Sequence, residues 1–90
     1  MDEQALISEI KETVEACPGV SRLVSPLMPG RSVKLSKNGG TTGADVYIKA
    51  AYGENIPKLS WTVQERIIET IEKNGGRAAG INIHVQGVER

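Results

Sequence analysis

The sequence predicts a small two-layer α+β domain, in which two helices cover one face of a mixed sheet of three or four strands. Three observations carry this prediction. Two segments repeat apolar residues every three or four positions, which is the period of an amphipathic helix. Other segments alternate apolar and polar residues, as half-buried strands do. The 90 residues provide room for one core, so we expect a single domain over residues 1–90.

The first predicted element is a helix close to the start of the chain. Leu6, Ile10 and Val14 recur at intervals of four residues and define one apolar side. A proline and a glycine follow closely, so the helix should end near Ala16. The short segment 20–24 is apolar at both ends and is consistent with a brief strand.

A β-hairpin is predicted in the middle of the chain. The run 31–36 alternates Val33 and Leu35 with polar residues. A second run over 46–51 alternates in the same way. The intervening Asn-Gly-Gly-Thr-Thr-Gly segment, 38–43, is typical of a turn and joins the two runs as a hairpin.

The last two predicted elements are a long helix and a strand. Asn55 is a suitable N-cap, and Pro57 fits the first helical turn, where a missing N–H costs nothing. The glycines after Asn74 should end the helix. The core stripe of this helix comprises Ile56, Leu59, Val63, Ile67 and Ile71. The final strand points Ile81, Ile83 and Val85 inward and Asn82, His84 and Gln86 outward. If the strands that flank the helix are parallel, their connection is a right-handed crossover.

Composition excludes several classes of function. Lys+Arg and Asp+Glu are both 11, and this zero net charge argues against a general nucleic-acid or anionic-membrane binder. One cysteine and one histidine cannot form a structural zinc site or an internal disulfide, and we expect no metal and no cofactor. The sequence shows neither the pattern of a signal peptide nor an apolar membrane span. We therefore expect a cytoplasmic protein that reaches a membrane only through a partner.

Catalytic chemistry is not predicted. Only Cys17 and His84 carry nucleophile or base chemistry at neutral pH. Cys17 continues the apolar side of the first helix and is interpreted as a small packed hydrophobe. His84 is interpreted as an exposed strand histidine, because nothing nearby in the sequence supplies a partner or an orienting group. The glycine-rich segment 39–43 joins two strands, so we expect no phosphate loop there, and its Gly40–Gly43 part is not expected to be the loop of a KH-type RNA-binding domain.

Two surfaces are candidate binding sites. Trp61 and Ile68 share an arc of the long helix roughly 120° from the core stripe. Either the first helix covers them, or they form an apolar patch that binds another protein or another copy of the chain. The outer sheet face carries a second candidate set, which would bind RNA or an anionic ligand: Lys34, Tyr47, Lys49 and His84. An ordinary solvated sheet face is favoured there, because a stacking platform usually has several aromatic residues.

The motifs in order resemble a known family. The segment 48–57 is similar to an apolar strand followed by Tyr-Gly, two residues and Ile, and the segment 81–88 is similar to a closing Val-Asn-Val-x-Val-x-Gly-Val. Gln64 before a spaced apolar run, and Gly19-Val20 upstream, also fit. Together they resemble the alkaline-shock (envelope-stress-response) family of bacteria, over about Ala5 to Val88.

This resemblance implies a non-enzymatic cytoplasmic protein of Gram-positive-type bacteria, associated with cell-envelope homeostasis or alkaline stress. Some relatives self-assemble, and others are held at the membrane by an anchored partner, so the implied partners are a second copy of the chain and a membrane-anchored protein. No catalytic residues carry over. The first helix begins almost at the N-terminus and the chain stops soon after the last strand, so the resemblance implies a minimal version of the domain.

Overall fold

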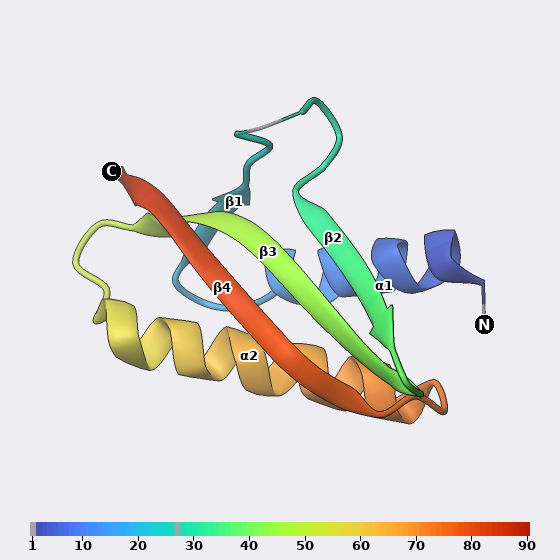
Figure 1. The fold of residues 1–90 in the computed structure, drawn as a ribbon. Coiled ribbons are helices and arrows are strands. Elements are labelled where there is room, and N and C mark those ends of the chain that lie inside the picture. Colours follow the sequence, from blue (N-terminus) through green and yellow to red (C-terminus); the bar gives the residue numbers. More distant parts are fainter. Residues whose placement is uncertain (1, 27) are drawn as a thin grey trace.

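The computed structural model describes residues 2–26 and 28–90 as one α+β domain (Figure 1). Its elements are α1 (Glu3–Glu15), β1 (Val20–Leu23), β2 (Val33–Asn38), β3 (Thr41–Ala51), α2 (Ile56–Lys73) and β4 (Ala78–Glu89). The predicted order of helix, short strand, hairpin, helix and strand is confirmed.

The sheet is built around β3. Both β1 and β2 pair antiparallel along one edge of β3, β1 over Ile48–Ala50 and β2 over Thr41–Val46. On the other edge β4 pairs parallel to β3, so the sheet is mixed. The connection between these two parallel strands is α2, as expected of a strand–helix–strand unit. Because β3 is paired on both sides, β4 is left as an edge strand.

Both helices pack on the same face of the sheet and enclose the core. α1 packs against β1, β2 and α2, and α2 packs against β4 (Figure 1). The largest fully buried side chains are Ile10, Val14, Val46, Ile48, Val63, Ile67 and Ile71. They come from the apolar stripe of each helix and from the inward side of β3, which is the arrangement that their periodicity predicts.

Local signals set the ends of α2. The Asn55 side chain accepts a hydrogen bond of 3.0 Å from the Lys58 N–H, and Pro57 lies in the first turn. At the other end, Gly75 has a positive φ of 87°, and the Gly76 N–H donates to the Ile71 carbonyl at 3.0 Å. These contacts satisfy backbone groups that a helix end leaves unpaired.

The structure moves two predicted boundaries. The hairpin turn consists of Gly39 and Gly40 alone, whose φ values of 58° and 89° fit the two central positions of a tight hairpin turn. β3 therefore begins at Thr41, within the segment interpreted as a turn. β4 begins at Ala78, ahead of the predicted start at Ile81, because Ala78 pairs with Thr42. Small side chains and glycine conceal both extensions from a pattern based on alternating hydrophobicity.

Candidate functional site

On the outer face of the sheet, His84 of β4 contacts two side chains of β3, Tyr47 and Asp45. Tyr47 and His84 are register partners, and their rings stack with centroids 4.5 Å apart and planes 15° apart. The Nε2 atom of His84 lies 2.9 Å from Asp45 Oδ1. Because the Asp45 and His84 side chains are both about one-third exposed, this cluster forms a shallow polar surface and not a buried site.

This geometry corrects the interpretation of His84 as a histidine without a partner. Asp45 supplies an orienting carboxylate, and it was missed because it lies 39 residues away in the sequence. The polar side of β3 carries Asp45 and Tyr47 two residues apart, but only the parallel register with β4 brings His84 beside them. A base oriented by a carboxylate still needs a nucleophile within reach. Cys17 does not serve, because it is buried in the core under the opposite face.

The four residues predicted on the outer face are brought together by the β2–β3–β4 register. Lys34 is the register partner of Asp45. Lys49 lies 3.9 Å from Glu89. Together with Tyr47 and His84, Lys34 and Lys49 make up the four predicted residues. The stacked pair therefore lies between two lysines, each of which has a carboxylate nearby.

At the far end of this face, Glu89 contacts Ser21, Arg22 and Lys49. A hydrogen bond from Arg22 first, and one from Ser21 second, hold the pKa of the Glu89 carboxyl below its ordinary value. The same contact raises the pKa of Arg22. Glu89 thus ties β1 to β4 although the two strands do not pair with each other.

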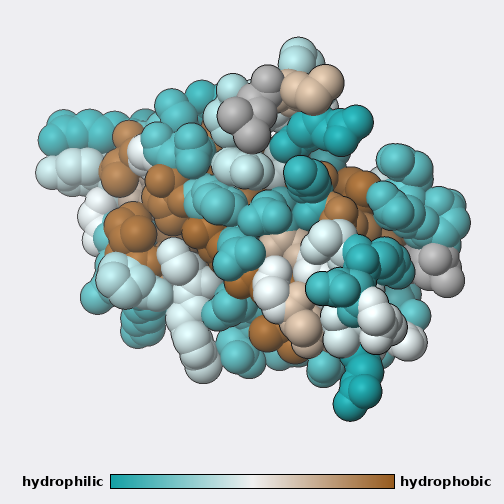
Figure 2. All heavy atoms as spheres, viewed as in Figure 1, coloured by the Kyte–Doolittle hydropathy of each residue, from teal (hydrophilic) through white to brown (hydrophobic). Residues whose placement is uncertain are grey.

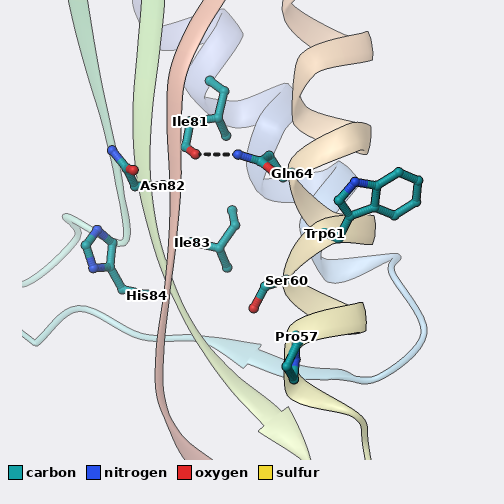
Figure 3. A pocket seen from close by; sticks show the side chains of 8 residues that line it. All are labelled: Pro57, Ser60, Trp61, Gln64, Ile81, Asn82, Ile83 and His84. Atoms are coloured by element: carbon teal, nitrogen blue, oxygen red, sulfur yellow. Dashed lines mark hydrogen bonds between the residues drawn. The ribbon is translucent and has the colours of Figure 1, made fainter.

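A groove of about 460 Å³ lies between α2 and β4. Gln64 crosses it, and its Nε2 donates to the Ile81 carbonyl at 2.8 Å (Figure 3). Trp61 is 62% exposed, and its ring points away from β4. The groove is lined by Pro57, Ser60, Trp61, Gln64, Ile81, Asn82, Ile83 and His84.

The two residues predicted as a protein interface differ in exposure. Trp61 is at the surface, whereas Ile68 is half-buried and packs against the core. α1 therefore does not cover Trp61. Hydrophobic residues also reach the surface in a diagonal band on the side where β4 and α2 lie (Figure 2). Whether Trp61 and Ile68 act together as an interface stays a prediction.

Other chemistry is limited in the described part of the chain. Cys17 is 3% exposed, its thiol donates to the Thr13 carbonyl at 3.3 Å, and burial raises the pKa of the thiol. The interpretation of Cys17 as a packed hydrophobe is confirmed. Residues 2–26 and 28–90 contain no group of three or more His, Cys, Asp or Glu side chains placed to hold a metal ion. Across the same residues, neither helix has the length and hydropathy needed to span a bilayer.

Comparison with known proteins gives a family and a fold. The model of the alkaline-shock protein family, described as having a cell envelope-related function, matches residues 7–90. No curated protein matches the chain. Among solved structures, a variant of the MamM CTD has a TM-score of 0.73 at 18% identity, over 98% of this chain and 100% of that chain.

Two further structures of the same domain agree. The MamM CTD over its residues 215–293 has a TM-score of 0.72 at 17% identity, over 96% of this chain and 99% of that chain. A nickel form of another MamM CTD variant has a TM-score of 0.71 at 18% identity, over 96% and 99%. At these identities the likeness establishes the fold and nothing further.

Proposed function

The chain belongs to the alkaline-shock protein family, whose function is related to the cell envelope, and we propose that it serves there as a non-enzymatic protein-interaction and assembly module. The observation that carries this proposal is the exposure of Trp61 beside the α2–β4 groove. Tryptophan is enriched at protein interfaces, where it fills pockets at the centre of the contact. In a chain with one tryptophan and no phenylalanine, placing that residue outside the core favours a binding role.

The proposed partners are a second copy of the chain and a membrane-anchored protein. Zero net charge leaves little long-range repulsion between copies. In this proposal the protein is cytoplasmic and reaches the membrane through the anchored partner. Trp61 and Ile68 form the proposed interface, in which Trp61 is exposed and Ile68 is half-buried.

A single substitution tests the proposal. Trp61→Ala should reduce the oligomer mass measured by light scattering, because it removes the largest exposed apolar side chain beside the groove. Tyr52→Ala is the matched control, since Tyr52 is also aromatic and is 64% exposed but does not line the groove. The proposal is wrong if Trp61→Ala leaves both the oligomer mass and the melting temperature unchanged.

A second candidate function is binding of single-stranded RNA to the outer sheet face. The stack of Tyr47 on His84, between Lys34 and Lys49, favours it, because aromatic rings and cations on a sheet are what unpaired bases and phosphates contact. An RNA oligonucleotide titrated at increasing salt should then bind with an affinity that falls steeply. Binding that is absent at low salt, or a Lys34→Gln/Lys49→Gln variant that binds as wild type does, removes this candidate.

A further inference from the structure

β4 is a long edge strand whose residues between Arg77 and Glu89 include neither a charged side chain nor proline. Among the described strands it pairs with β3 alone. Exposed edges are commonly blunted by charged side chains or proline, since unpaired backbone groups attract another strand. Between Arg77 and Glu89, β4 contains no Lys, Arg, Asp, Glu or Pro. Its regular part, between two register irregularities, runs from Ile81 to Val85.

The direction of the backbone groups of β4 follows from three hydrogen bonds. In β3, the Tyr47 N–H donates to the Ser32 carbonyl and the Tyr47 carbonyl accepts from the Val24 N–H, so the backbone groups of Tyr47 point away from β4. In β4, the Ile81 carbonyl accepts from Gln64 and therefore points out of the sheet edge. Backbone groups alternate along a strand, so those of Ile83 and Val85 point outward as well. No backbone hydrogen bond found among the described residues engages them from outside the sheet.

We propose that the outer edge of β4, over Ile83 and Val85, accepts an extended segment of a partner protein as an added strand. This inference rests on the proposed function, and it names the kind of partner element that the module binds. Main-chain hydrogen bonds provide the affinity in such complexes, and alternate side chains provide the specificity. The groove beside α2 receives one set of the incoming side chains.

The side chains around the edge define the sequence of that segment. Alternate residues of the added strand point toward the groove, where Pro57 of α2 and Ile81 and Ile83 of β4 favour apolar side chains. The intervening residues lie beside the outer face of β4, next to Asn82 and His84. With no charge along this part of β4, the matching segment alternates apolar and uncharged polar residues.

The position of α2 selects an extended segment over a second folded copy. Gln64 reaches the outward carbonyl of Ile81, so α2 lies close to the plane of the edge, and the Trp61 ring projects beyond the helix (Figure 3). If a second copy paired its own β4 with this edge, its own α2 would be brought against the α2 that already lies beside the edge. A single extended chain needs only the spacing between strands, about 4.8 Å.

The test supplies a strand in cis to the full chain. A flexible Gly-Ser linker after Arg90 carries the tail Thr-Val-Thr-Val-Thr-Val-Thr, so that its effective concentration at the edge is on the order of millimolar. Hydrogen exchange measured by NMR at Ile83 and Val85 should slow about tenfold or more relative to the chain without a tail. The control tail has proline in place of each valine and cannot pair as a strand.

Variants of α2 test the groove. Ser60→Arg should abolish the protection given by the valine tail, because Ser60 lines the groove. Glu69→Arg, on an exposed position outside the groove, should leave it intact. Circular dichroism should show that both variants fold.

Two results overturn the inference. One is equal exchange at Ile83 and Val85 with the valine and proline tails. The other is protection of these amides in the untailed chain that grows with protein concentration, which would mean that a second copy occupies the edge. Neither result depends on Trp61→Ala, so failure of the edge inference is distinct from failure of the proposed interface.

Discussion

His84 depends on two neighbours that are distant in the sequence. The ring of Tyr47 covers one of its faces, and Asp45 accepts a hydrogen bond from its Nε2 in the tautomer that protonates this nitrogen. An aromatic stack and a partly exposed hydrogen bond each contribute about 1 kcal/mol or less. The cluster therefore stiffens the outer face without dominating the stability of the domain.

His84→Ala is expected to lower the free energy of unfolding by about 1 kcal/mol, since it removes the stack and the contact with Asp45 together. Gln86→Ala is the control, because Gln86 lies on the same strand, outside the stacked cluster. Urea unfolding followed by circular dichroism measures both. Equal stabilities of the two variants would contradict the energetic role given to the cluster.

Two adjacent isoleucines on α2 allow a comparison of burial. Ile67 is 0% exposed and Ile68 is half-buried. Ile67→Ala should cost about 2–5 kcal/mol, which is a large part of the stability of a domain this small. Ile68→Ala should cost less than half of that. If thermal unfolding of the monomer shows that Ile68→Ala costs more than half as much stability as Ile67→Ala, then Ile68 belongs to the core and not to an interface.

At the scale of elements, α2 and β4 do most to shape the candidate surfaces. α2 packs its buried stripe against the core and presents Trp61 to solvent. β4 shares one edge with β3 and leaves the other edge facing the groove. The position of α2 along β4 therefore matters for both proposals, and the cap at Asn55 helps to set where the helix begins.

Asn55→Ala should destabilise the domain by about 1 kcal/mol, because the Lys58 N–H loses its acceptor. For a domain of this size, that corresponds to a fall in melting temperature of about 4–8 °C. Asn55→Asp retains an acceptor at the N-terminus of the helix and should stay close to wild type. Equal losses in the two variants would assign the effect to something other than capping.

At the scale of the whole molecule, the contacts of two glutamates join segments far apart in the chain. Glu89 binds Arg22 and Ser21, which joins β4 to β1. Glu9 accepts from Asn74 at 3.0 Å and lies 3.1 Å from Lys73, which joins α1 to the end of α2. The hydrogen bond from Asn74 first, and Lys73 second, lower the pKa of Glu9. Both glutamates are ionised in these contacts at neutral pH.

These lowered pKa values predict a loss of stability in acid. A carboxyl whose pKa is lower in the folded protein stabilises it above the unfolded value, about 4.3, and this stabilisation disappears as the pH falls through the folded pKa. The melting temperature of wild type should therefore fall between neutral pH and about pH 3. The double variant Glu9→Gln/Glu89→Gln should start lower and fall less over the same range.

Glu15→Gln is the control for the acid experiment, because Glu15 takes part in none of the ion pairs found among the described residues. Its melting profile should run parallel to that of wild type. Parallel profiles for the double variant as well would contradict the assignment to Glu9 and Glu89. Because both contacts lie at the surface, salt should reduce the difference.

The sequence by itself determined the fold class, the order of the elements and most of their ends. These depend on short-range features: the apolar stripe of each helix, the Asn55 cap, and the glycines at the hairpin and after α2. The family resemblance followed from motifs in the same local segments, and the match over residues 7–90 confirms it. The starts of β3 and β4 were missed, because Thr41–Gly43 and Ala78–Gly80 lack the alternating hydrophobicity that marks a strand.

Only the tertiary structure decided which distant residues meet. The β3–β4 register places His84 on Tyr47 and beside Asp45, and a shift of β4 by one residue would turn His84 to the other face. The packing of α2 against β4 decides that Gln64 binds the Ile81 carbonyl, that Trp61 is exposed and that Ile68 is half-buried. Periodicity specifies the face of an element, whereas register and packing specify its neighbours, because these depend on contacts between segments that the local pattern does not encode.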